Sequence, residues 1–188
     1  MEMPRRAAPP PRMDAEAFVA WAMDQPAGRY ELVDGEVVAM APERVVHNRI
    51  KARAWRALDD AVRAAGLPCQ AFTDGMAVRV DDGLVFEPDA SLRCGPPLDD
   101  DAVVFDDPLV VVEVLSPGTR GVDAGKKLGG YFLLPSVRHY VMLDPGPRTA
   151  IHHARAEDGA IATAILRDGA LRLDPPGIAI PLAALFEG

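Results

Sequence analysis

Apolar and polar positions repeat with two different periods along this 188-residue chain, and the changes of period separate predicted helices from predicted strands. In residues 43–65 apolar side chains recur every three or four positions, which predicts a long helix. Residues 14–24 predict a shorter amphipathic helix, and Asp14 is of the residue type preferred at a helix N-cap. Both predicted helices lie in the first third of the chain.

The remaining segments predict an alternation of strands and helices. Asp34-Gly35 lies between two alternating runs within residues 29–42, which predicts a β-hairpin. The run LVVVEVL (109–115) is nearly continuous in apolar residues and predicts a strand buried on both faces. Further strands are predicted at 69–74, 76–80, 84–94, 138–144, 149–155 and 160–169, and further helices at 122–134 and 181–188.

These elements predict one mixed α/β domain over residues 13–188, preceded by a flexible leader over residues 1–12. The leader lacks the apolar stretch of a secretory signal, and no run is long enough to cross a membrane. Cys69 and Cys94 lie far apart in the sequence without a CxxC spacing, so we expect neither a zinc site nor a disulfide. Two unpaired thiols fit a reducing compartment, so we expect a cytoplasmic location.

Charge is distributed unevenly. The formal net charge of −8 argues against a protein that coats nucleic acid nonspecifically, because such binding requires a basic surface. The predicted helix within 43–65 is nevertheless locally basic and carries Arg44, Arg49, Lys51, Arg53, Arg56 and Arg63. A solvated helix face is one interpretation of this cluster, and a contact to phosphates is the other.

Glu113 is the single charged residue of the apolar run 109–115. A buried carboxylate costs several kcal/mol unless it is paired or binds a metal, so Glu113 requires a partner. One possibility is a core arginine or lysine. The other is Asp89, which the antiparallel pairing of 84–94 with 109–115 would bring beside Glu113, with a divalent cation between the two carboxylates.

Five blocks of sequence resemble the Uma-type family of restriction endonucleases within the PD-(D/E)xK nuclease superfamily. They occur in the family's order over roughly residues 14–145. The blocks are RYELVDGE (29–36), His47-Asn48-Arg49-Ile50, EPDAS (87–91), VVEVLSPGT (111–119), and Asp123 followed by Lys127, Leu128 and Tyr131. The resemblance implies a restriction-endonuclease-like core, a central mixed sheet of about four or five strands flanked by helices, with an N-terminal helix and hairpin.

The resemblance also implies a catalytic set. Asp89 and Glu113 would bind Mg²⁺ or Mn²⁺ together with the backbone carbonyl of Val114, and Glu31 would lie near the metal as an outer or second-metal ligand. In this family the lysine of the E-x-K element is often missing from the strand. Leu115 occupies its place here, so the lysine must come from elsewhere. Lys127, on the helix after the strand, is the expected replacement and would orient the attacking water.

Further residues have supporting roles in this hypothesis. Asp123, Lys127 and Tyr131 are spaced four residues apart and share one helical face. Asp123 would hold Lys127 in place, and Tyr131 would lie next to the ligands as a further supporting residue. His47 and Arg49 would contact substrate phosphates, although a packing role for His47 and for Tyr131 remains open.

The expected activity is metal-dependent hydrolysis of phosphodiester bonds in DNA. A homodimer is expected by analogy with enzymes that cut both strands of a duplex. Two alternatives stay open. The first is a nuclease-fold module with little or no turnover that binds nucleic acid or assists another protein, and the second is a purely structural network of ions.

Overall fold

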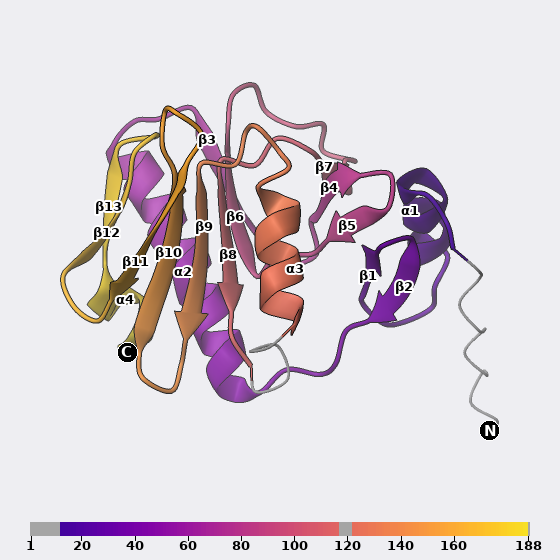
Figure 1. Ribbon diagram of the computed structural model, residues 1–188, viewed down its shortest axis with the longest axis horizontal. Coiled ribbons are helices and arrows are strands. Elements are labelled where there is room, and N and C mark those ends of the chain that lie inside the picture. Colours follow the sequence, from indigo (N-terminus) through magenta and orange to yellow (C-terminus); the bar gives the residue numbers. More distant parts are fainter. Residues whose placement is uncertain (1–11, 117–121, 188) are drawn as a thin grey trace.

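A six-stranded mixed sheet forms the centre of the computed structural model (Figure 1). The structure describes residues 12–116 and 122–187, and within the second range it describes side chains from residue 125 onward. In spatial order the strands are β11 (Ile161–Leu166), β10 (Thr149–Arg155), β9 (His139–Asp144), β8 (Val110–Val114), β6 (Ala90–Cys94) and β3 (Cys69–Thr73). β8 and β9 are parallel, and the other neighbours are antiparallel. The expected mixed α and β class is confirmed, but the sheet has six strands rather than four or five.

A second sheet lies beside the first. It contains five strands in the order β2 (Glu36–Ala39), β1 (Tyr30–Val33), β5 (Leu84–Phe86), β4 (Ala77–Asp81) and β7 (Val104–Phe105). The predicted hairpin connects β1 and β2, and its turn residues Asp34 and Gly35 have φ angles of 52° and 77°, the left-handed pair that a tight hairpin turn requires. Helix α1 (Ala15–Met23) begins as predicted, with Asp14 accepting a hydrogen bond from the Ala17 amide.

Helices cover both faces of the central sheet. Figure 1 shows α3 (Val122–Tyr131) beside β8, and α2 (Val45–Ala64) behind the sheet. The C-terminal helix α4 (Leu182–Phe186) and a two-stranded hairpin, β12 (Ala170–Leu173) and β13 (Ile178–Pro181), pack with α2 on that second face. The hairpin was not predicted, because residues 170–181 contain prolines and show no strong alternation.

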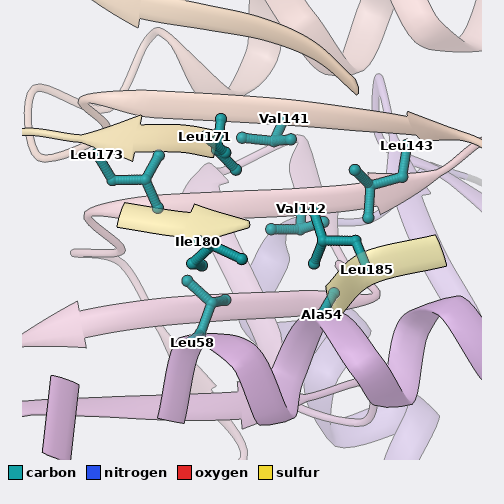
Figure 2. Close-up of a pocket in the computed structure, with 9 residues that line it drawn as sticks. All are labelled: Ala54, Leu58, Val112, Val141, Leu143, Leu171, Leu173, Ile180 and Leu185. Carbon is teal, nitrogen blue, oxygen red and sulfur yellow. The ribbon is translucent and has the colours of Figure 1, made fainter. Parts of the chain in front are cut away.

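One apolar cluster forms the core between the sheet and α2, with the buried His139 at its edge. Each fully buried leucine or valine there contributes about 1.5–3 kcal/mol by leaving water. A small cavity of about 10 Å³ remains, and Figure 2 shows the side chains that line it: Ala54, Leu58, Val112, Val141, Leu143, Leu171, Leu173, Ile180 and Leu185. We call this side of the sheet the dry face.

Segment 84–94 does not form one continuous strand, contrary to our expectation. It divides at Glu87-Pro88-Asp89, so that β5 belongs to the five-stranded sheet and β6 to the six-stranded sheet. Proline has no amide hydrogen to donate to a sheet ladder, which explains a break at Pro88. Asp89 therefore lies where the chain crosses from one sheet to the other.

Two further expectations concern the cysteines and membranes. The expectation of unpaired cysteines was wrong: Cys69 and Cys94 are register partners on β3 and β6 and form a disulfide. Their 25-residue separation hid a contact that only the strand pairing creates. Within the described ranges, no helix is long and apolar enough to span a membrane.

Candidate functional site

The site is built where β8 ends and β6 begins. These strands are antiparallel, with Ala90 opposite Val112, so Asp89 lies beside the last residues of β8. The Val114 amide donates a 2.7 Å hydrogen bond to Oδ2 of Asp89. The predicted antiparallel pairing is confirmed, and Asp89, which is only 3% exposed, is fixed to the backbone next to Glu113.

Glu113 receives its partners from helix α3. Nζ of Lys127 and the hydroxyl of Tyr131 donate to Oε1 of Glu113 over 2.9 Å and 3.0 Å. The side chains of Lys127 and Tyr131 reach one carboxylate because they lie one helical turn apart. Gly130 allows the helix to approach, since a Cβ atom there would lie 2.6 Å from the Phe86 ring.

Glu31 joins the two sheets at this point. Its Oε1 lies 2.8 Å from Nζ of Lys127 and accepts a 2.9 Å hydrogen bond from the Glu87 amide. Lys127 is thus shared by two carboxylates, one from β1 and one from β8. Glu31, Asp89, Glu113, Lys127 and Tyr131, all singled out from the sequence, lie together.

His47 approaches Asp89 from the first turn of α2. Its Nε2 atom is 3.1 Å from each carboxylate oxygen of Asp89. Arg49, two residues further along the helix, is exposed. The side chain of Asp123 lies outside the described residues, so its predicted role stays a prediction.

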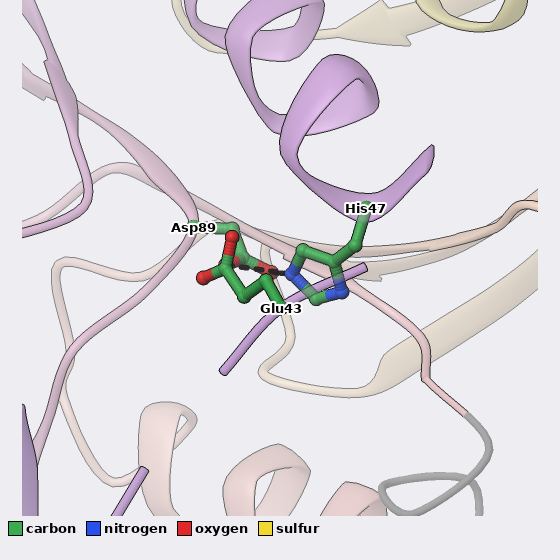
Figure 3. Close-up of side chains that lie close together, drawn as sticks. All are labelled: Glu43, His47 and Asp89. Carbon is green, nitrogen blue, oxygen red and sulfur yellow. Dashed lines mark hydrogen bonds and ion pairs between the residues drawn. The ribbon is translucent and has the colours of Figure 1, made fainter. Parts of the chain in front are cut away.

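Figure 3 shows a cluster of three potential metal ligands: Glu43, His47 and Asp89. One donor atom from each lies within 4.8 Å of the other two. Glu43 was not predicted as a site residue, although its spacing of four residues from His47 was a usable signal. Asp89 therefore belongs to two clusters of potential metal ligands. One cluster contains Glu113, and the other contains Glu43 and His47.

An ion-pair network that the sequence did not reveal surrounds Glu43. Lys51, of which 4% is exposed, binds Glu43 at 2.6 Å and Asp74 at 2.9 Å. Arg29 binds Glu43, Asp74 and Glu87 over 2.7–2.9 Å. These five residues come from four separate segments, so no local pattern connects them.

The whole cluster contains more acids than bases. Six carboxylates, those of Glu31, Glu43, Asp74, Glu87, Asp89 and Glu113, face three permanently charged cations, Arg29, Lys51 and Lys127. Clustered carboxylates repel one another in a medium of low dielectric constant unless a cation balances them. Carboxylate oxygens suit Mg²⁺ or Mn²⁺, so the carboxylates present fit a divalent cation.

The pKa shifts reflect the same excess of acid. Burial raises the pKa of Glu113 to about 7; the charge of Lys127 opposes the shift, and the charges of Asp89 and Glu31 add to it. Burial acts to lower the pKa of Lys127, but Glu113 and Glu31 raise it overall, so the ammonium stays charged. Burial disfavours the charged form of Asp89, yet its hydrogen bond to His47 lowers the pKa of the carboxyl overall.

An open groove of about 820 Å³ leads to the site beside α2. Arg29, Glu43, Asn48, Lys51 and Asp74 line it, together with the backbone from Met40 to Pro42. Charged and amide side chains therefore extend from the carboxylates to the surface.

Three comparisons with known proteins place this chain among its relatives. The Uma2 family model, described as "Putative restriction endonuclease", matches residues 15–183. Two uncharacterized proteins of Synechocystis, sll1609 and slr1290, are 23% and 26% identical over 138 and 137 residues. Each alignment covers 72% of this chain, and they cover 77% and 70% of the relatives.

A solved structure shares the fold. The crystal structure described as "a putative nuclease belonging to DUF820" from Anabaena variabilis matches with a TM-score of 0.71 at 16% identity, over 85% of this chain and 90% of that one. The likeness supports the nuclease-like fold expected from the sequence.

Proposed function

The chain belongs to the Uma2 family, and from that membership we propose that it is a nuclease that hydrolyses phosphodiester bonds of DNA with Mg²⁺ or Mn²⁺. The observation that carries the proposal is the excess of buried carboxylates around Asp89 and Glu113, with a lysine held between Glu113 and Glu31. A structural salt-bridge network would be expected to balance its charges, whereas a cation site retains an excess of acid.

In this proposal Asp89 and Glu113 supply the carboxylate oxygens to the cation, and Val114 supplies its carbonyl. The bound cation lowers the pKa of a water and neutralises charge on the phosphate. Glu31 remains an outer ligand. Tyr131 holds Glu113 by its hydroxyl, since that hydrogen bond fixes the rotamer of a buried carboxylate.

Lys127 takes the role of the E-x-K lysine, whose place on the strand is occupied by Leu115 in this chain. Its ammonium, held between Glu113 and Glu31, is in position to orient the attacking water and to stabilise the charged phosphorus centre. A lysine on the helix can reach the strand because Gly130 permits close packing. Lys126 is bound to Asp34 at 2.9 Å and takes no part.

Residues on α2 complete the proposed site. The bond of His47 to Asp89 supports a place beside the cation, with Glu43 as a further oxygen donor. Arg49 is exposed on the same helix, which suits contact with a substrate phosphate. The open groove beside Arg29 and Asn48 would admit the strand next to the scissile bond.

The test is a cleavage assay on plasmid, single-stranded DNA and RNA with Mg²⁺ or Mn²⁺. We expect the wild type to cut DNA and Asp89→Asn to fall to background, because the substitution removes a charged ligand without changing size. Asp82→Asn is the matched control, since Asp82 is an exposed turn residue paired with Arg79. Unchanged cleavage by Asp89→Asn would refute the assignment, and metal binding without any cleavage would favour the accessory-module alternative.

A further inference from the structure

Strand β11 forms an outer edge of the six-stranded sheet and carries no charged residue. Its sequence is IATAIL, and residues 161–165 are all exposed. Ile161 and Ile165 are 40% and 61% exposed, although both are large apolar side chains. Monomeric proteins commonly protect such an edge with charges, proline, a bulge or a covering element, because an open edge pairs with other chains.

The backbone of β11 presents a regular set of hydrogen-bonding groups to the outside. The Ala156 amide donates to the Ala160 carbonyl over 2.8 Å, which fixes the alternation of the β10–β11 ladder. Even-numbered residues of β11 then bond to β10, while the amides and carbonyls of Ile161, Thr163 and Ile165 point away from it. Three donors and three acceptors thus line the open edge.

The sequence of this edge is self-complementary. Residues 161–165 read IATAI in both directions, with Thr163 at the centre. In an antiparallel pair of two such strands around a two-fold axis at Thr163, Ile161 lies opposite Ile165 of the second copy and alanine opposite alanine. The hydrogen bonds between the two copies would then join the outward backbone groups of Ile161, Thr163 and Ile165.

The ends of the strand are complementary in charge. The same two-fold pairing brings Arg167, one residue beyond β11, toward the β10–β11 turn of the second copy, which carries the exposed Asp158. An arginine beside a partner's aspartate occurs once at each end of the paired strands. This arrangement favours the register centred on Thr163 over registers shifted by two residues.

We propose that β11 is the homodimerisation edge of this protein and that two copies join their six-stranded sheets through antiparallel β11–β11 pairing. The proposal does not depend on the metal site, since β11 lies three strands from β8. A single strand pair buries less than the roughly 1,600 Å² of a standard interface, so we expect a micromolar dimer that dissociates on dilution.

Sedimentation velocity from about 1 to about 500 µM tests the assignment on the full chain. We expect the wild type to pass from monomer to dimer across this range and Ile165→Lys to remain monomeric. Met23→Lys is the matched control: Met23 is 65% exposed and lies on α1, at the opposite end of the molecule in Figure 1. A monomeric wild type at the highest concentration would overturn the proposal, as would an Ile165→Lys variant that dimerises normally.

Hydrogen exchange on the wild type gives an independent test that requires no folded variant. We expect the amides of Ile161, Thr163 and Ile165 to become at least roughly tenfold slower in exchange as the dimer forms, because they then acquire partners. The amides of Ala162 and Ala164, already bonded to β10, should be protected at every concentration. Equal exchange rates of the outward amides at low and high concentration would overturn the proposal.

Discussion

The two faces of strand β8 are opposite environments built from one five-residue strand. Val110, Val112 and Val114 face α2 and belong to the dry face, whose core is apolar apart from the buried His139 at its edge. Val111 and Glu113 face α3, where an apolar cluster borders a buried carboxylate, a lysine and a tyrosine hydroxyl. Adjacent residues of a strand point to opposite faces, so a single step along the chain changes from one environment to the other.

The difference shows what a buried charge requires in this protein. Glu113 is tolerated because α3 supplies two donors, the ammonium of Lys127 and the hydroxyl of Tyr131. Among the described residues, the small cavity of the dry face beside Val112 is lined by apolar side chains alone. Burial of a charge is therefore specified by long-range partners rather than by the strand itself.

Placing a carboxylate on the dry face of β8 should have the largest effect on the free energy of unfolding. In Val112→Glu the new acid has no cation within reach, so we expect a loss of roughly 4 kcal/mol or more in the free energy of unfolding. Glu113→Val should retain a folded protein, since Lys127 keeps Glu31 as its partner, but should abolish cleavage. Urea unfolding of both variants checks this, and a stable Val112→Glu variant would contradict the comparison.

Loss of Lys127, the lysine bound to Glu113, should have the next largest effect, a fall in the cleavage rate. We expect Lys127→Met to lower the cleavage rate by roughly 10²–10³-fold, because it removes the positive charge that faces the reacting phosphate. Lys126→Met, one residue earlier and half-exposed, should cleave at the wild-type rate. Single-turnover cleavage assays measure both, and equal rates for the two variants would remove Lys127 from the proposed mechanism.

On the dry face the corresponding truncation should reduce stability and leave chemistry unchanged. Leu58 is 1% exposed and lines the small cavity, so Leu58→Ala should enlarge it and lower the free energy of unfolding by about 2–5 kcal/mol. Chemical denaturation gives the loss. Cleavage per folded molecule should equal that of the wild type, and a large fall in that rate would show that the two faces are coupled.

The smallest predicted effect is a pH dependence at the edge of the dry face. His152 lies against His139, with its Nε2 atom 2.9 Å from Nδ1 of His139. Burial, with the charges of His139 and His153, lowers the pKa of His152 to about 4. The folded state therefore binds fewer protons than the unfolded state between about pH 4 and 6.5, and stability falls as the pH is lowered through that window.

Thermal melting of wild type and His152→Gln across this window measures the effect. Carboxylates such as Asp89 also affect stability at acid pH, so the difference between the two proteins is the relevant quantity. We expect the wild type to lose more stability than His152→Gln between pH 6.5 and pH 4. Parallel profiles would show that His152 accepts a proton in the folded protein as readily as in the unfolded one.

Local patterns in the sequence were sufficient to predict much of the fold. The cap at Asp14, the turn at Asp34-Gly35 and the buried run of β8 each depend on neighbouring residues, and each is present as predicted. The proximity of Glu113 to Asp89 and Lys127 could also be anticipated, because the resemblance supplied the long-range information that spacing lacks.

The features that were missed depend on pairing between distant segments. The Cys69–Cys94 disulfide needs the β3–β6 register, and the division of residues 84–94 needs two separate sheets. The network of Arg29, Lys51 and Asp74 joins segments that share no local motif. Propensity and periodicity report on a residue and its near neighbours, so they contain no signal for such contacts.

A crystal grown or soaked with Mn²⁺ tests the central claim most directly, because anomalous scattering locates the ion without reference to activity. The account predicts an anomalous peak bonded to a carboxylate oxygen of Asp89, with Glu113 or with Glu43 and His47 as its companions, and no such peak in Asp89→Asn. An anomalous map of the wild type without a peak at Asp89, at a Mn²⁺ concentration that supports cleavage, would contradict it.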